Sequence, residues 1–330
     1  MSSATETSTI TMGKALNLAL HDALRDDPRV LVFGEDVGKL GGVFRVTDGL
    51  RDTFGQERVF NTPLAEATIA GAALGLAIKG FHPVAEMQFD AFSYPSFQQV
   101  TSNIAKYHTR TGGACPMSLV IRIPYGGNIG AIEQHSESPE TYYVHTAGLK
   151  VVTPSNPSDA YGLLRAAIAD PDPVIFLEPK ARYQRRVEWT QPTAPDALDK
   201  AKVALEGTDA TVIAYGPMVS VALEAAQIAS SEGVSLEVVD LRSLSPIDWD
   251  TLYRSARKTK RVVVVHEAPL FMGLGAEIAA RLMHDLFDSL AAPVERLGAP
   301  TTPYPPSRHE KLFLPDADRI LEAVDRLREF

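Results

Sequence analysis

Glu66 is the first residue in this sequence whose type and setting suggest chemistry. It lies in the string TPLAE at residues 62–66, in the first turn of an expected helix that follows a short apolar strand. A glutamate there commonly balances the positive end of the helix dipole. A carboxylate at the carboxyl edge of a parallel sheet, where α/β proteins bind ligands, can instead exchange a proton with a ligand. Gly71 and Gly75 permit close packing behind it, so Glu66 is a candidate acid–base residue.

A loop histidine is the second candidate. His135 lies in the string QHSESPE at residues 134–140, shortly after the glycine-rich loop at residues 125–130. Loop histidines are commonly solvated, but this loop follows an expected buried strand, which predicts His135 at the same sheet edge as Glu66. Because histidine titrates near neutral pH, it could donate or accept a proton there. His145 is interpreted as structural.

An aromatic run, MQFDAFSYP at residues 87–95, also follows an expected strand. Most of its side chains are expected in the core. A phenylalanine at the end of a strand can, however, stack on a flat ligand ring.

Common phosphate-binding and hydrolase motifs are absent from the sequence. It contains no GxGxxG between a strand and a helix, no GxxxxGK[ST], no GxSxG and no HExxH. An enzyme built on this chain would therefore have none of the common phosphate-binding loops of its own.

The elements that must position these residues follow an α/β pattern, in which short apolar runs alternate with helical periods. The first half has expected strands near residues 30–33, 84–89, 119–123, 150–153 and 174–178, and expected helices near 11–26, 65–79, 97–110 and 158–169. The second half has expected strands near 210–215, 236–240 and 261–266, and expected helices near 218–230, 248–257, 275–290 and 316–327. An irregular stretch between them predicts two doubly wound domains, at residues 11–185 and 201–330, with a linker at 186–200.

Composition excludes several classes of protein. The chain has 330 residues, is 45% hydrophobic and carries a net charge of -9, which argues against non-specific nucleic-acid binding. No apolar run reaches the ~18 residues of a membrane span. The single cysteine, Cys115, excludes an intrachain disulfide and fits a reducing, cytoplasmic compartment. Residues 1–10 carry no secretory signal and are expected to be a disordered lead-in.

Several ordered strings in this sequence resemble one family. They are FGEDV at 33–37, GGVFR at 41–45, TPLAE at 62–66, HSESPE at 135–140, GLKVV at 148–152, FLEPK at 176–180, DLRSLSP at 240–246 and HEAP at 266–269. Together they resemble the beta subunit of the thiamine-diphosphate-dependent 2-oxo acid dehydrogenase component, in the branched-chain and pyruvate group. The resemblance spans roughly residues 10–327. It implies a transketolase-like pyrimidine-binding domain followed by a transketolase C-terminal domain.

The resemblance also implies roles for particular residues. Glu66 would hydrogen-bond N1′ of the aminopyrimidine of thiamine diphosphate and promote the tautomer that removes the C2 proton. Phe92 would stack on the pyrimidine ring, and Leu64 and Gln88 would line its pocket. His135 would lie near the reacting carbon and assist acyl transfer to lipoamide.

A monovalent cation such as K⁺, held through backbone carbonyls, belongs to the same family pattern. The matching positions are Leu119, Val120, Ala167, Asp170 and Asp172. The string DPDP at residues 170–173 is equally typical of a plain turn. Two departures from the family pattern occur nearby. Gln98 stands where the family often has aspartate, and Asp90-Ala91 reverses the usual order.

Partners follow from the resemblance as well. The family's diphosphate and Mg²⁺ are held mainly by the alpha subunit, and this chain has no Gly-Asp-Gly. An alpha2beta2 heterotetramer that passes its acyl group to a lipoyl acyltransferase is therefore expected. The second domain is expected to serve assembly more than chemistry, with His266-Glu267 as a structural turn.

The strings at residues 135–140 and 122–127 resemble those of the branched-chain members more than those of the pyruvate members, and this resemblance favours a substrate such as 3-methyl-2-oxobutanoate. The alternatives are a pyruvate or acetoin dehydrogenase beta subunit and, more remotely, a non-catalytic scaffold subunit.

Overall fold

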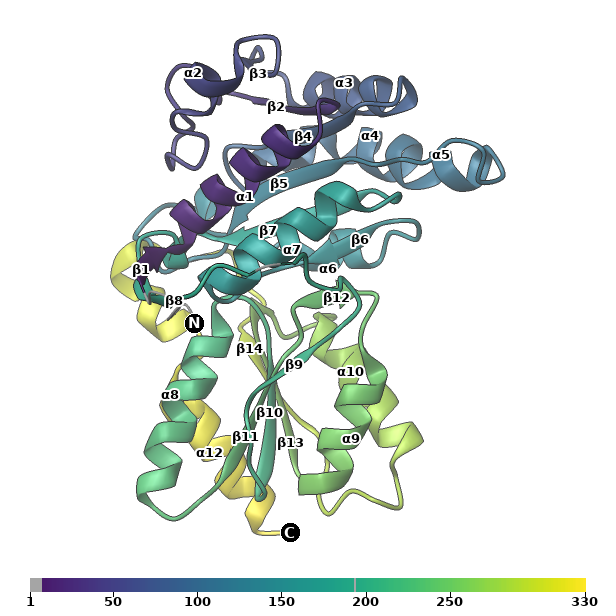
Figure 1. Ribbon diagram of the computed structural model, residues 1–330. Coiled ribbons are helices and arrows are strands. Elements are labelled where there is room, and N and C mark those ends of the chain that lie inside the picture. The colour runs from purple at the N-terminus through teal and green to yellow at the C-terminus, as the bar shows by residue number, and fades with distance from the viewer. Residues whose placement is uncertain (1–7, 193) are drawn as a thin grey trace, which may run out of the picture. The chain divides into compact units, whose positions relative to one another are not determined.

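The structure is a computed structural model that describes residues 8–192 and 194–330 (Figure 1). The chain forms two units. Unit 1 comprises the described residues up to Tyr125 together with Tyr142–Leu198, and unit 2 comprises Gly126–Thr141 and Asp199–Phe330.

A parallel sheet forms the centre of unit 1. Its strands run in the order β6 (Lys150–Val152), β7 (Val174–Pro179), β5 (Val120–Tyr125), β4 (His82–Glu86), β2 (Val30–Gly34) and β3 (Val59–Asn61). Every residue of β2, β5 and β7 is buried, as expected for parallel strands that are covered on both faces. The prediction of a parallel α/β sheet is confirmed.

Helices surround this sheet. They are α1 (Met12–Asp26), α2 (Leu50–Phe54), α3 (Glu66–Ile78), η1 (Ala91–Ser96), α4 (Phe97–Gln99), the π-helical turn η2 (Val100–Ile104), α5 (Ala105–Arg110), α7 (Pro157–Ala169) and η4 (Lys180–Arg182). Helix α1 begins at its cap Thr11, whose side chain accepts from the amide of Lys14 at 3.2 Å. Helix α7 begins in the same way, because Asn156 accepts from the amide of Asp159 at 3.0 Å.

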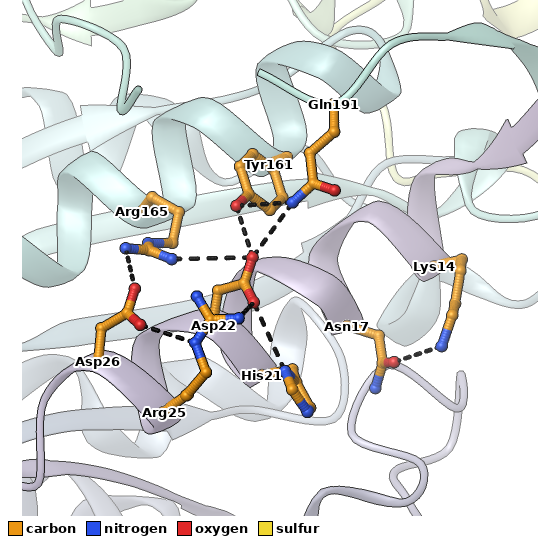
Figure 2. Close-up of polar contacts among 9 residues, drawn as sticks. All are labelled: Lys14, Asn17, His21, Asp22, Arg25, Asp26, Tyr161, Arg165 and Gln191. Atoms are coloured by element: carbon orange, nitrogen blue, oxygen red, sulfur yellow. Dashed lines mark hydrogen bonds and ion pairs between the residues drawn. The ribbon is translucent and has the colours of Figure 1, made fainter. Parts of the chain in front are cut away.

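Helices α1 and α7 pack against each other and lie in front of the strands in Figure 1. Figure 2 shows Asp22 of α1 at the centre of their polar contacts. Its carboxylate accepts from the Tyr161 hydroxyl at 2.6 Å and from the Gln191 amide at 3.2 Å. Arg165 donates to Asp26 at 2.9 Å. These contacts fix α1, α7 and the segment around Gln191 to one another.

Two expectations about irregular segments differ from the structure. The lead-in predicted at residues 1–10 falls mostly on residues 1–7, which lie outside the described residues, but β1 (Ser8–Thr11) is a strand. It pairs antiparallel with β8 (Arg186–Trp189), which lies inside the predicted linker. Strands this short and polar have no clear period, and their pairing partner lies far along the chain.

Unit 2 contains a second sheet. Its strands run in the order β14 (Glu295–Ala299), β13 (Val262–Pro269), β10 (Ala210–Ala214), β11 (Leu236–Asp240) and β9 (Lys202–Leu205). Strands β14, β13, β10 and β11 are parallel, and β9 is antiparallel to β11. Figure 1 shows α8 (Met218–Ser231) and α12 (Ala317–Arg328) on one face, and α9 (Trp249–Thr259) and α10 (Leu274–Asp285) on the other.

Short elements complete the described chain. They are η3 (Glu133–His135), α6 (Glu140–Val144), β12 (Ser243–Ser245), η5 (Ser307–His309) and α11 (Glu310–Phe313). Helix α10 ends at Asp285, five residues before the predicted end. Across the described ranges, no helix is long and apolar enough to span a membrane.

Candidate active site

The carboxyl ends of three neighbouring strands bring the predicted unit 1 residues to one edge. Gly34 at the end of β2 is in register with Asn61 of β3 and with Glu86 of β4. The segments that follow these strands therefore leave the sheet together. A Cβ atom at Gly34 would lie 2.5 Å from the Glu86 carbonyl oxygen, so this close approach requires glycine.

Glu66 is the first residue of α3 and is half-buried. The N-cap residue, Ala65, makes no side-chain hydrogen bond. The free amides of the first turn are therefore not capped by the side chain of the N-cap residue. Glu66 is close enough to Glu35 that its charge raises the pKa of the Glu35 carboxyl. The two carboxyl groups therefore belong to one electrostatic cluster.

Glu35 is a further candidate for this site and was not assigned from the sequence. It directly follows β2, is 2% exposed, and neither carboxyl oxygen has a hydrogen-bond partner among the described residues. Burial first, and then the charges of Glu66 and Asp36, raise its pKa to about 7. A proton bound to Glu35 is therefore held and released near neutral pH. The strand immediately before it is the sequence signal that could have identified it.

Replacing Glu35 by glutamine is expected to change how stability depends on pH. The folded-state pKa of about 7 lies above the ordinary value of 4.5, so the unfolded chain loses this proton first as pH rises. The stability that the wild type gains over Glu35→Gln is therefore greatest below pH 4.5 and is lost as the pH rises through about 7. Denaturant unfolding of both full chains from pH 4.5 to 8 measures this difference. A difference that stays constant across this range would refute the burial argument.

The remaining predicted cofactor residues of unit 1 lie in different settings. The Gln88 amide donates to Asp36 at 3.2 Å, which links the segments after β4 and β2. Phe92 lies in η1, half-buried, and its ring centre is 5.6 Å from that of Phe89 in an edge-on contact. Leu64 is 79% exposed. The Leu64 side chain is thus presented at the surface of this chain, two residues before Glu66.

A buried ionic network supports this edge from within the sheet. Arg122 of β5 donates to both carboxylate oxygens of Glu178, at 2.6 and 2.9 Å, and to Glu86 at 2.6 Å. The Tyr183 hydroxyl also donates to Glu178. Burial raises the pKa of Glu86 although Arg122 opposes this. Because Arg122 binds Glu178 through two bonds and Glu86 through a third, the network ties β4, β5 and β7 together.

The positions predicted to hold a cation make other contacts in this structure. The Leu119 carbonyl accepts from the Val174 amide at 3.0 Å, and the Ala167 carbonyl accepts from the Asp170 amide at 3.4 Å. The Asp170 carboxylate pairs with Lys150 at 2.7 Å, and that of Asp172 pairs with the same lysine at 3.2 Å and hydrogen-bonds His108 at 2.6 Å. Their side chains are thus engaged in ion pairs. Within the described part of the chain, no group of three or more His, Cys, Asp or Glu side chains is placed to hold a metal ion.

His135 belongs to unit 2, whereas Glu66, Leu64, Gln88 and Phe92 belong to unit 1. It ends the short helix η3 and is half-buried, and its amide donates to the Ile132 carbonyl at 3.0 Å. The structure therefore brings the four unit 1 residues to one set of strand ends and places His135 on a loop of the second unit.

Both halves of the chain match known domains. Residues 8–186 match the transketolase pyrimidine-binding domain, and residues 199–320 match the transketolase C-terminal domain. A 3-methyl-2-oxobutanoate dehydrogenase subunit beta from Mycobacterium tuberculosis is 56% identical over 324 residues, which are 97% of this chain and 92% of that protein. The chain belongs to the transketolase-like beta subunits of 2-oxo acid dehydrogenases.

Other members of this beta-subunit family are similar over the same length. A pyruvate dehydrogenase E1 component subunit beta from Leifsonia xyli is 55% identical, with 96% of this chain and 94% of that protein covered. One from Bacillus subtilis is 45% identical, with 97% and 99% covered. A split-gene transketolase, solved as an inactive beta4 tetramer, superposes with a TM-score of 0.79 at 25% identity, over 96% of this chain and 98% of that one. The beta-subunit resemblance and the transketolase-like fold expected from sequence are confirmed.

Proposed function

We propose that this chain is the beta subunit of the decarboxylating component of a 2-oxo acid dehydrogenase complex, and that its substrate is a branched-chain 2-oxo acid. The observation that carries the proposal is the carboxylate cluster of Glu35 and Glu66 at the carboxyl edge of the unit 1 sheet. The relative named for 3-methyl-2-oxobutanoate is 56% identical, and the strings HSESPE and RIPYGG favour the same substrate class. The 55% identity to a pyruvate dehydrogenase subunit keeps pyruvate as the second candidate.

Family membership implies thiamine diphosphate as the cofactor, and the residues present fit it. Glu35 and the Thr62 hydroxyl are buried polar groups at this edge without hydrogen-bond partners among the described residues, as expected where a polar ligand binds. When bound, thiamine diphosphate supplies the electron sink for decarboxylation. Glu66 would hold and move a proton at N1′ of its pyrimidine. Phe92 would stack on the pyrimidine ring, with Leu64 and Gln88 beside it.

The acyl transfer step would use a different residue. His135 would donate a proton to one sulfur of the lipoyl disulfide, which is released as a thiol when the S–S bond breaks and the other sulfur takes the acyl group. Its loop position in unit 2 suits a group that meets a large, mobile substrate arm. A lipoyl acyltransferase is thus the proposed acceptor of the product.

An alpha subunit would complete the cofactor site. The chain lacks a Gly-Asp-Gly string, so Mg²⁺ and the diphosphate would be held mainly by alpha. The exposed Leu64 beside Glu66 offers an apolar contact for such a partner. The similar split-gene transketolase is described as inactive as a beta4 tetramer, which supports the need for a second chain. We expect an alpha2beta2 heterotetramer in the cytoplasm. K⁺ would be held by the carbonyls of Leu119, Val120, Ala167, Asp170 and Asp172; those of Leu119 and Ala167 each accept one hydrogen bond and keep a second lone pair for the ion.

Reconstitution tests this function. The purified chain alone is expected to show no 2-oxo acid-dependent reduction of an artificial electron acceptor, because half of the cofactor site is missing. Adding the alpha subunit and thiamine diphosphate should produce turnover, with kcat/KM higher for 3-methyl-2-oxobutanoate than for pyruvate. Turnover by the chain without alpha would contradict the two-subunit site. A preference for pyruvate would establish the second candidate instead.

A further inference from the structure

Two carboxylates of unit 2 bind the backbone of the loop that carries His135. The amide of Gly127 donates to Glu267, and the amide of Asn128 donates to Glu310 at 2.7 Å. The flanking residues Gly126 and Asn128 have φ values of 83° and 62°, in the left-handed region. Consecutive amides in such a turn form a concave group of donors that favours anions. Here the anions are two glutamates of the same chain.

Both glutamates are enclosed. Glu267 is 4% exposed and Glu310 is 7% exposed. The Tyr304 hydroxyl donates to Glu310 at 2.5 Å and accepts from the Asn128 amide at 3.2 Å. A Cβ atom at Gly127 would lie 1.9 Å from this hydroxyl, so only glycine fits there. Hydrogen bonds from amides to carboxylates that are buried away from water are stronger than hydrogen bonds between neutral groups.

The far end of the same loop is also attached to unit 2. The Tyr215 hydroxyl, directly after β10, donates to Glu140 at 2.7 Å, and Glu140 is fully buried. The amide of Gly126 donates to the Glu137 carbonyl at 2.9 Å, which closes the loop on itself. His135 lies between these two attachments.

From these contacts we infer that Glu267 and Glu310 are positioning residues for His135. They act through the backbone of Gly127 and Asn128, and they hold the loop in the one conformation that presents the imidazole. This inference rests on the proposed function of His135 in acyl transfer. It gives unit 2 a part in the chemistry, whereas the sequence analysis expects a structural turn at His266-Glu267 and a role in assembly.

The test compares Glu267→Ala, Glu267→Gln and Glu310→Ala in the heterotetramer reconstituted with alpha. Hydrogen–deuterium exchange measured by mass spectrometry on peptides covering 126–141 should be about tenfold faster in Glu267→Ala, because a charge-assisted bond to the loop is lost. Glu267→Gln keeps an acceptor oxygen and should restore most of the protection. Glu277→Ala, an exposed change on α10, is the matched control and should leave exchange unchanged.

Activity gives the second readout on the same variants. Acyl transfer to a lipoyl domain should fall about tenfold in Glu267→Ala, with decarboxylation measured by an artificial acceptor retained. The double variant Glu267→Ala/His135→Ala should transfer the acyl group no more slowly than His135→Ala alone, since both changes remove the same function. Additive losses, or wild-type exchange over 126–141 in every variant, would overturn the inference. If Glu267→Ala fails to fold, Glu310→Ala, which removes the acceptor of the Asn128 amide, carries the same test.

Different results would refute the proposed function and the positioning role of Glu267 and Glu310. A wild-type assembly without any 2-oxo acid turnover would refute the proposed function. The exchange measurement does not depend on turnover and would still decide whether the two glutamates hold the loop.

Discussion

Replacing Glu66 by glutamine is expected to slow 2-oxo acid-dependent reduction of an artificial acceptor by about a hundredfold to ten-thousandfold. Glutamine keeps the size of the side chain and a hydrogen-bonding group. It removes the carboxylate that exchanges a proton with the pyrimidine, so the first chemical step and all later steps should slow together. KM for the 2-oxo acid should change little, because Glu66 is not proposed to contact it. Steady-state kinetics of the reconstituted heterotetramer provide the measurement.

The matched control for this variant is Glu57→Gln, which makes the same chemical change at an exposed position of unit 1. It should retain wild-type kcat and KM. A Glu66→Gln enzyme with more than half of wild-type kcat would show that the carboxylate has no part in the reaction.

Replacing His135 by alanine is expected to separate the two half-reactions. Acyl transfer to a lipoyl domain should fall about a hundredfold, because the departing sulfur loses its proton donor. Decarboxylation assayed with the artificial acceptor should stay within a few-fold of wild type, since that assay bypasses the lipoyl group. Single-turnover kinetics of each half-reaction provide the comparison.

His145→Ala is the control for this second prediction, because the sequence analysis interprets His145 as structural. It should leave the ratio of the two half-reactions unchanged. Equal losses of both half-reactions in His135→Ala would mean that the histidine shapes the pocket and transfers no proton.

The long, strongly patterned elements of the fold could be predicted from sequence. The apolar run of β7 and the i, i+3, i+4 face of α1 specify their structures locally, and the structure has both at the expected residues. Pairings between distant short segments could not be predicted. Strand β9 reads KVAL and β14 reads ERLGA, and both lie at sheet edges where few apolar residues are needed.

The candidate site likewise has residues that a local pattern predicts and residues that depend on contacts with distant parts of the chain. Glu66 follows a recognisable strand and starts a recognisable helix, so its position at a sheet edge could be inferred locally. The raised pKa of Glu35 depends on burial and on the charge of Glu66, a residue about thirty positions away, and no local pattern encodes that. The prediction of a structural turn at His266-Glu267 was wrong, because both residues lie in the buried strand β13. The bond of Glu267 to Gly127 joins residues 140 positions apart, which no local pattern shows.

The most direct test of the account is the rate of C2 hydrogen–deuterium exchange of thiamine diphosphate bound in the heterotetramer. The cofactor is quenched with acid at millisecond delays, and its C2 proton is followed by NMR for wild type, Glu66→Gln and His135→Ala. We predict fast exchange in wild type and in His135→Ala, and exchange slowed at least a hundredfold in Glu66→Gln. Exchange at the wild-type rate in Glu66→Gln would contradict the assignment of Glu66 as the residue that activates the cofactor.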